Sequence, residues 1–140
     1  MPQSEGRAEL ARRIDAVEAS YEFMLAFAAQ GVVITNGQAN DGQIREYLKR
    51  LDTALADLAG AWRSVVEAER LQPADAYASF LDVLSRDAAA AQAAVRLVLG
   101  QPAIGSQLVD NLNASLHVRA VLTDLFVLDE ILNPHTVQTT

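Results

Sequence analysis

The side chains that most readily do chemistry are scarce in this chain. It has two histidines, His117 and His135, and no cysteine. The lack of cysteine excludes disulfides, cysteine-ligated zinc, iron–sulfur clusters, thiol catalysis and covalent c-type haem. A di-iron helical bundle needs Glu-x-x-His pairs, but Ala114 and Leu132 stand three positions before the histidines. We therefore expect no metal site and no resident cofactor.

One evenly spaced titratable set is Asp110, His117 and Asp124, at seven-residue intervals. Seven residues are two helical turns, about 10.5 Å, so neither carboxylate reaches His117 along one helix. This spacing favours a solvated helix flank. A haem held by Met24 and His117 is an alternative, but His117 flanks the apolar seam of its segment, which favours a surface histidine. The chain also lacks a G-x-S-x-G elbow and a glycine-rich phosphate loop, so we expect a non-enzymatic protein without catalytic residues.

Acidic side chains also gather near the N-terminus, at Asp15, Glu18 and Glu22. Carboxylates so close together can bind a cation, or one of them can have a raised pKa. The neighbouring Arg12 and Arg13 offer a simpler interpretation. They favour ordinary ion pairs along one helix face.

The composition narrows the class of protein. Of the 140 residues, 51% are hydrophobic, which is enough apolar surface for the core of one domain. The net charge is -7 and the pI about 4.7, so phosphate backbones and anionic bilayers repel the surface. The N-terminal residues have no apolar signal-peptide core, and no apolar run approaches the ~20 residues that span a bilayer. We expect a cytoplasmic protein that binds neither nucleic acid nor membranes.

Apolar residues recur at alternating intervals of four and three in four segments, which predicts helices near 5–30, 41–70, 73–99 and 105–132. Two of these seams are Ile44, Leu48, Leu51, Leu55, Leu58, Trp62 and Val65, and Ala114, Val118, Val121, Leu125, Leu128 and Leu132. The connection 31–40 spans at most roughly 33 Å, too short to run back along a helix of roughly 39 Å. The prediction is an all-α, antiparallel up-down-up-down four-helix bundle. Its single domain covers 1–132, followed by a polar tail at 133–140.

The third segment is poor in large side chains around Ala88 and Ala91. Alanine favours a helix but buries little surface. Either this helix packs closely against its neighbours, or the small residues leave a cavity for an apolar small molecule or a non-covalent cofactor. Gly60 in the second segment favours close approach of the third helix over a hinge.

One end of the predicted bundle is strongly apolar. The ends and loop that meet there contribute Phe23, Phe27, Val32, Val33 and Ile34. A bundle core needs one stripe per helix, and some of these residues fall outside the stripes. Either the loop folds down as a lid, or another chain covers this end, because large exposed apolar patches are rare on monomers.

The last segment carries a second apolar line beside its seam, Leu108, Leu112, Leu122 and Phe126. A helix that is apolar around most of its circumference is normally buried around most of it. A bundle leaves one face outward, so a second subunit on a two-fold axis is the simplest cover. We expect a homodimeric accessory, adaptor or assembly protein that docks onto a protein partner. Its predicted contact residues are Phe23, Phe27, Val32, Val33, Ile34, Leu122 and Phe126.

Overall fold

The all-helical prediction is confirmed by a computed structural model, which describes residues 5–33 and 41–134. Six helices and no strand occur in these residues: α1 (Glu5–Ala29), α2 (Gly42–Leu55), α3 (Leu58–Glu69), α4 (Ala74–Leu99), α5 (Ser106–Ala114) and α6 (His117–Leu132). None of these helices is both long and apolar enough to cross a membrane. Most of the predicted tail, from 135 onward, lies outside the described residues.

The expected continuous helix 41–70 is wrong, because α2 and α3 are separated by Ala56 and Asp57. Ala56 is extended (ψ 122°) and Asp57 is left-handed (φ 51°). A Cβ on Gly60 would lie 2.2 Å from the Asp57 Oδ1, so Gly60 makes room for the Asp57 side chain over the first turn of α3. The atoms nearest to Gly60 therefore belong to Asp57 of this local turn.

The expected continuous helix 105–132 is also wrong, since Ser115 and Leu116 separate α5 from α6. Leu116 is left-handed (φ 66°), and the Ser115 hydroxyl donates to the Leu112 carbonyl at 2.6 Å. The reason lies in the apolar spacing. The α5 helix buries Val109 and Leu112, whereas α6 buries Val118 and Val121. Leu112 and Val118 are six positions apart, which does not fit one heptad seam, so a straight helix could not turn both stripes to one core.

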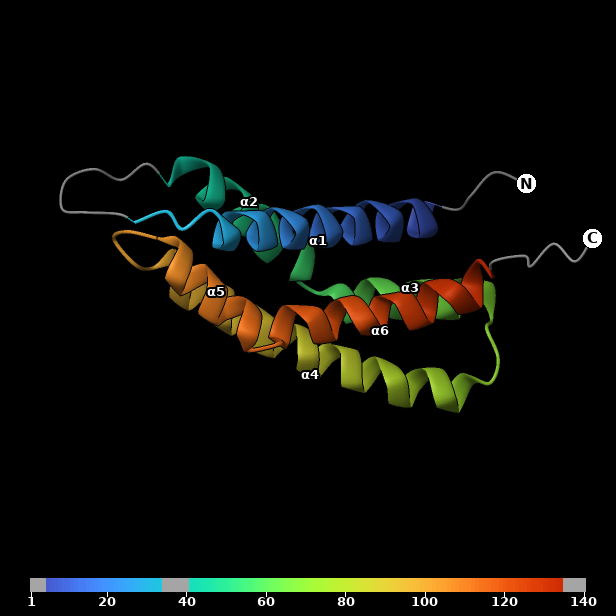
Figure 1. The fold of residues 1–140 in the computed structure, drawn as a ribbon. Coiled ribbons are helices and arrows are strands. Elements are labelled where there is room, and N and C mark those ends of the chain that lie inside the picture. Colours follow the sequence, from blue (N-terminus) through green and yellow to red (C-terminus); the bar gives the residue numbers. More distant parts are fainter. Residues whose placement is uncertain (1–4, 34–40, 135–140) are drawn as a thin grey trace, which may run out of the picture.

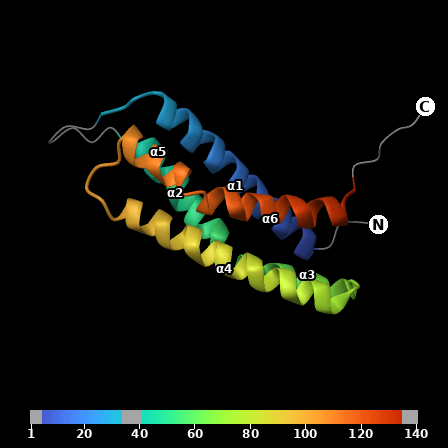
Figure 2. The same cartoon turned by 60° about the horizontal axis from the view of Figure 1, so that its bottom comes forward.

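The two helix pairs that these breaks separate, α2–α3 and α5–α6, pack around the same core as α1 and α4. Both α1 and α4 contact members of the α2–α3 pair and of the α5–α6 pair. In Figures 1 and 2, α1 and α4 lie on opposite sides of the molecule, with the two pairs between them. The seam between α1 and α2 is therefore on the far side from the seam between α4 and α6.

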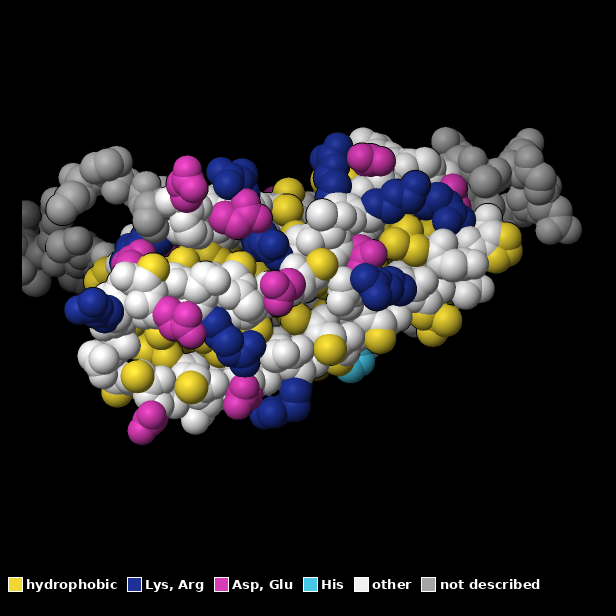
Figure 3. Space-filling model, turned by 180° about the vertical axis from the view of Figure 1, so that it is seen from behind, with side chains coloured by type: hydrophobic (Ala, Val, Ile, Leu, Met, Phe, Trp, Pro, Cys, Tyr) yellow, Lys and Arg dark blue, Asp and Glu magenta, His cyan; other side chains and the backbone are white. Residues whose placement is uncertain are grey.

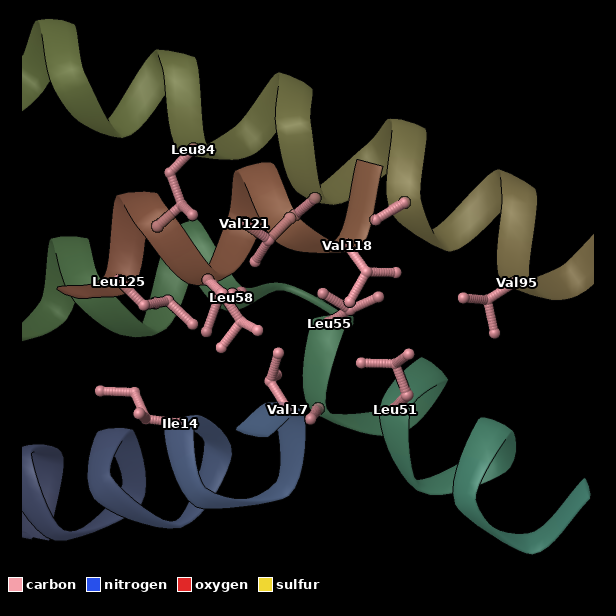
Figure 4. Close-up of a cluster of buried hydrophobic side chains, with 14 of the residues drawn as sticks. Ile14, Val17, Leu51, Leu55, Leu58, Leu84, Val95, Val118, Val121 and Leu125 are labelled. Atoms are coloured by element: carbon pink, nitrogen blue, oxygen red, sulfur yellow. The ribbon is translucent and has the colours of Figure 1, made fainter. Parts of the chain in front are cut away.

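Side chains from α1, from α4 and from both helix pairs meet in one core (Figure 4). Leu55 and Leu58, on either side of the first break, are each 1% exposed and point into it. Trp62 is also 1% exposed, although its indole Nε1 has no hydrogen-bond partner among the described residues. The heptad phase runs unchanged through Leu55 and Leu58, so this break alters the path of the chain while both leucines stay buried.

The left-handed Leu116 gives a prediction about stability. An L-residue in this conformation costs about 1–2 kcal/mol that glycine does not. Leu116 is 55% exposed, so its removal loses little burial. Glycine loses more backbone entropy on folding than leucine, which offsets part of this gain. Leu116→Gly should therefore raise the free energy of unfolding by about 0.5–1 kcal/mol in urea titration. The matched control is Leu97→Gly, another exposed leucine but within α4, which should lose about 1 kcal/mol. Equal losses in both variants would contradict the assignment of strain.

Candidate functional site

The apolar end of the molecule is closed by a buried serine. The Ser106 hydroxyl donates to the Phe27 carbonyl at 2.5 Å and accepts the Val32 N–H at 2.7 Å. The Ser106 N–H donates in turn to the Val32 carbonyl at 2.8 Å. These three bonds hold the segment after α1 against the start of α5. Ser106 is 3% exposed, so little water competes for them.

A buried aspartate closes the same end from the other side. Asp41 is 4% exposed, accepts the Ile104 N–H at 2.9 Å and pairs with Arg45 at 3.1 Å. Arg45 also donates to the carbonyls of Leu99 and Gln101, at 3.1 and 2.7 Å. Burial alone raises the pKa of Asp41, but the bonds from Arg45 and Ile104 outweigh it and hold that pKa below its ordinary value. The start of α2 is thereby tied to the link between α4 and α5.

We call the bonds of Ser106 the Ser106 clasp and those of Asp41 the Asp41 clasp. Together they hold the backbone around the predicted contact residues of this end. Phe27 is 6% exposed. Phe23 is half-buried, with its ring centroid 4.2 Å from that of Tyr47. Val32 is half-buried, Val33 is 80% exposed, and Ile34 lies outside the described residues. Of the predicted contact residues described at this end, Val33 is therefore the exposed one, and Leu25 and Leu97, near the ends of α1 and α4, are also exposed.

The second predicted contact region, on α6, divides between core and surface. Leu122 is 5% exposed and belongs to the core, whereas Phe126 is 49% exposed. Two further apolar residues of α6 outside the predicted contact set, Val127 and Ile131, are 46% and 55% exposed. The break before α6 explains the division, because α5 and α6 each bury their own stripe. A second subunit is thus not needed to cover Leu112 or Leu122.

Beside these exposed residues lies an apolar groove of about 370 Å³ between α4 and α6. Its lining includes Pro73, Ala76, Tyr77, Phe80, Val127 and Ile131, and no lining residue is charged. We call it the α4–α6 groove. It combines two features of a contact site: apolar side chains left in solvent and a concave surface next to them.

One turn along α6 from Val127, a carboxyl group is buried in the same seam. Asp124 is 9% exposed, and the Asp87 carboxyl of α4 lies next to it. Burial, and next the neighbouring Asp87 carboxyl, raise the pKa of Asp124 to about 7. Among the described residues no donor reaches the Asp124 Oδ2, so the buried carboxyl is favoured in its protonated form. The expectation of a solvated flank is wrong for Asp124, although His117 and Asp110 are exposed.

The ion pairs expected near the N-terminus are arranged differently. Arg12 and Arg13 both pair with Glu9, each at 2.9 Å, and not with the acidic group at 15, 18 and 22. Burial, and then the charges of Asp15, Glu22 and Asp129, raise the pKa of Glu18. Helix α1 therefore has a flank toward α2 with arginines and an acidic flank toward α6.

The alanine-rich stretch of α4 is closed. Ala88 and Ala91 are 5% and 0% exposed and belong to the core, and neither lines the α4–α6 groove. Across residues 5–33 and 41–134, no group of three or more His, Cys, Asp or Glu side chains is placed to hold a metal ion. Comparison of the chain with models of known families, with curated proteins and with solved structures found no match.

The buried Asp124 predicts an unusual pH dependence. Its pKa is raised on folding, so its contribution to stability is present below its ordinary pKa of about 3.9 and is lost as pH rises toward 7. Asp124→Asn removes this loss and keeps a donor for Asp87. The variant should gain at least about 1 kcal/mol at about pH 8, or roughly 3–5 °C in Tm, and little at about pH 4. Thermal melts across pH test this prediction, with Asp110→Asn at an exposed position as the control. A Tm difference between Asp124→Asn and the wild type that is the same at every pH would refute it.

The Asp41 clasp predicts the opposite behaviour. Asp41→Ala should lose about 2–3 kcal/mol at neutral pH, because it leaves the Ile104 N–H and the partly buried Arg45 without their acceptor. Since its pKa is lowered on folding, the stabilisation by Asp41 disappears as pH falls through the acidic range. Asp82→Ala is the control, since Asp82 pairs with Arg63 at 2.8 Å on the exposed surface and should lose under about 0.5 kcal/mol. Similar urea midpoints for the two variants would show that the clasp is not needed.

Proposed function

We propose that this chain is a non-enzymatic adaptor or assembly protein of the cytoplasm that self-associates and docks onto a protein partner. The observation that carries the proposal is the α4–α6 groove, an uncharged apolar concavity bordered by exposed Val127 and Ile131. Burial of about 25 cal/mol per Å² of apolar surface makes such a surface favourable to cover. Phe126, on the next flank of α6, widens the surface available to a second chain.

A second copy of the chain is the occupant that best suits this groove. The exposed ridge, Val127 and Ile131, lies directly beside the concave wall formed by Ala76 and Phe80. On a two-fold axis, the ridge of each copy can enter the groove of the other, which makes the surface self-complementary. Each chain has a net charge of -7, so copies repel at long range. The absence of charge from the groove lets them approach there with the least penalty.

We infer further that the six helices act as a four-rod bundle with up-down-up-down order, each broken pair serving as one bent rod. The antiparallel register of α1 with the α2–α3 pair supports this inference. Ser20 Oγ donates to the Tyr47 carbonyl, whereas Arg7, nearer the start of α1, pairs with Glu69 of α3. The Asn113 side chain donates to the Met24 carbonyl, which supports the same register for α1 and α5. A rigid bundle would hold contact surfaces on separate seams at fixed positions.

A partner-docking role for the apolar end rests on Val33. This residue is exposed directly beyond the Ser106 clasp, whose bonds fix the backbone of Val32. A fixed backbone presents its next side chain at little entropic cost on binding. Phe23 and Phe27 would support this position from within.

The proposal is tested by placing charges in the groove border. The double variant Val127→Asp with Ile131→Asp should convert a dimer into a folded monomer, measured by light scattering and circular dichroism, because both side chains are about half exposed in one chain. The matched control is Leu25→Asp with Leu97→Asp, two exposed leucines that do not line the groove, and this control should remain dimeric. A monomeric wild type, or a groove variant with unchanged mass, would refute self-association through this groove.

A further inference from the structure

On the far side of the molecule from the α4–α6 groove, a second groove of about 510 Å³ lies between α1 and α2. Arg13 donates to the carbonyls of Ala54 and Ala56, which sets the register of the two helices. Small side chains, Ala16 and Ala54, line the groove, so nothing bulky fills it from below. We call this the α1–α2 groove. Figure 3 looks at this side, where charged side chains gather along the upper edge, over α1 and α2.

The charge of this groove is opposite to that of the whole chain. Its lining includes four cationic side chains, Arg12, Arg13, Lys49 and Arg50, and two carboxylates, Glu9 and Glu46. Four positive and two negative groups leave an excess of two positive charges, in a chain whose net charge is -7. The groove is a local electrostatic exception, and local sign decides short-range recognition because charges are screened beyond about 8 Å at physiological salt.

The carboxylates of the groove are already engaged by its own arginines. Glu9 accepts from Arg12 and Arg13, and these hydrogen bonds lower its pKa. Glu46 pairs with Arg50 at 3.5 Å. Because each carboxylate is already paired within the groove, the excess of two positive charges remains for a ligand.

The cationic side chains of this groove that can still contact a ligand are exposed to solvent. The Lys49 ammonium makes no ion pair or hydrogen bond with any described residue, and the Arg12 side chain is 68% exposed. Arg50 lies 5.1 Å from the centre of the Tyr47 ring, which in turn stacks on Phe23. The aromatic pair holds the Arg50 guanidinium at the edge of the groove. Donors are thus available on both walls, Arg12 on α1 and Lys49 and Arg50 on α2.

We propose that the α1–α2 groove binds a carboxylate-rich segment of the partner protein. Acidic side chains would meet the donors of both walls, and the small apolar residues between them would rest on Ala16 and Ala54. A long polyanion is a poorer match, because nucleic acid or an anionic membrane would extend beyond the groove onto a surface of the same sign. This assignment rests on the proposed adaptor function and adds the chemistry of its partner.

The two grooves then divide the two roles. The α4–α6 groove takes a second copy, and the α1–α2 groove, on the opposite seam, stays open in that dimer. The acidic flank of α1, at Asp15, Glu18 and Glu22, also carries carboxylates, which resemble those of the proposed partner segment and could enter the α1–α2 groove of another copy. Such a contact joins two different surfaces and does not close on a two-fold axis, so it would produce chains of subunits where the α4–α6 groove produces a pair.

The test uses a fluorescein-labelled peptide of about twelve alternating Glu and Ala residues, with a Gln–Ala peptide of the same length as its neutral control. Binding to the full chain is followed by fluorescence anisotropy at about 0.05 M and about 0.5 M salt. The groove variant is Arg12→Gln with Lys49→Gln. The matched control is Arg86→Gln with Arg119→Gln, which removes the same charge from two exposed arginines that do not line the groove.

We expect the Glu–Ala peptide to bind the wild type in a salt-sensitive manner and the Gln–Ala peptide not to bind. The groove variant should bind the acidic peptide about tenfold more weakly, and the control variant within about twofold of the wild type. Three outcomes would overturn the proposal: no binding at low salt, equal loss in both variants, or tighter binding of a single-stranded oligonucleotide or of anionic vesicles than of the peptide.

The oligomeric state separates this proposal from the proposed function. Light scattering of the Arg12→Gln, Lys49→Gln variant should give the same mass as the wild type, because the α4–α6 groove is unchanged. A lower mass would assign the α1–α2 groove to a second copy and overturn the assignment to a partner segment. Conversely, a monomeric wild type that still binds the acidic peptide through Arg12 and Lys49 would refute the dimer and keep the cationic groove.

Discussion

Every helix of this protein has to turn its apolar stripe toward one shared core, and the stripe of the last segment changes phase between Leu112 and Val118. The left-handed Leu116 resolves the conflict by starting a new helix. The direction of α6 sets which of its residues face inward, and so brings Leu122 and Asp124 into the core and leaves Val127 and Ile131 outside. The surface proposed for self-association therefore follows from the same phase change that a continuous helix could not accommodate.

Sequence reasoning was sufficient where one heptad seam runs the full length of a helix. The bounds expected near 5–30 and 73–99 agree closely with α1 and α4. Sequence reasoning missed the break at Asp57 because Leu55 and Leu58 keep the heptad spacing across it. The apolar periodicity therefore does not indicate where α2 ends. At Leu116 a trace existed, since the second apolar line beside the seam belonged to two helices with different buried faces. That line was interpreted as a surface for another subunit, when half of it was core.

The polar residues were harder to predict because their partners are distant in the sequence. Asp41 bonds to Ile104, and Ser106 to Phe27, across 63 and 79 positions. The i,i+4 spacing of Asp41 and Arg45 is visible in the sequence, but it is equally typical of an exposed helix pair. Asp124 carried a better signal, since it lies three residues after Val121 and four before Leu128, both in the core. A carboxyl at that position has to be solvated at the edge or hydrogen-bonded in the seam, and here Asp87 meets it across the interface with α4.

The distribution of charge gives the molecule two sides with different chemistry. On α1, Arg12 and Arg13 lie beside α2 and pair with Glu9, whereas Glu18 lies in an acidic group on the other flank, where burial and then the neighbouring carboxylates raise its pKa. The seam between α1 and α2 thus has a groove with an excess of positive charge, and the opposite seam has a groove without charge. Apolar burial is indifferent to sign and suits identical copies that repel one another, while a cationic groove discriminates between partners by charge. A protein with both grooves has room for its own copy and for a different chain at once, because the two grooves lie on opposite seams.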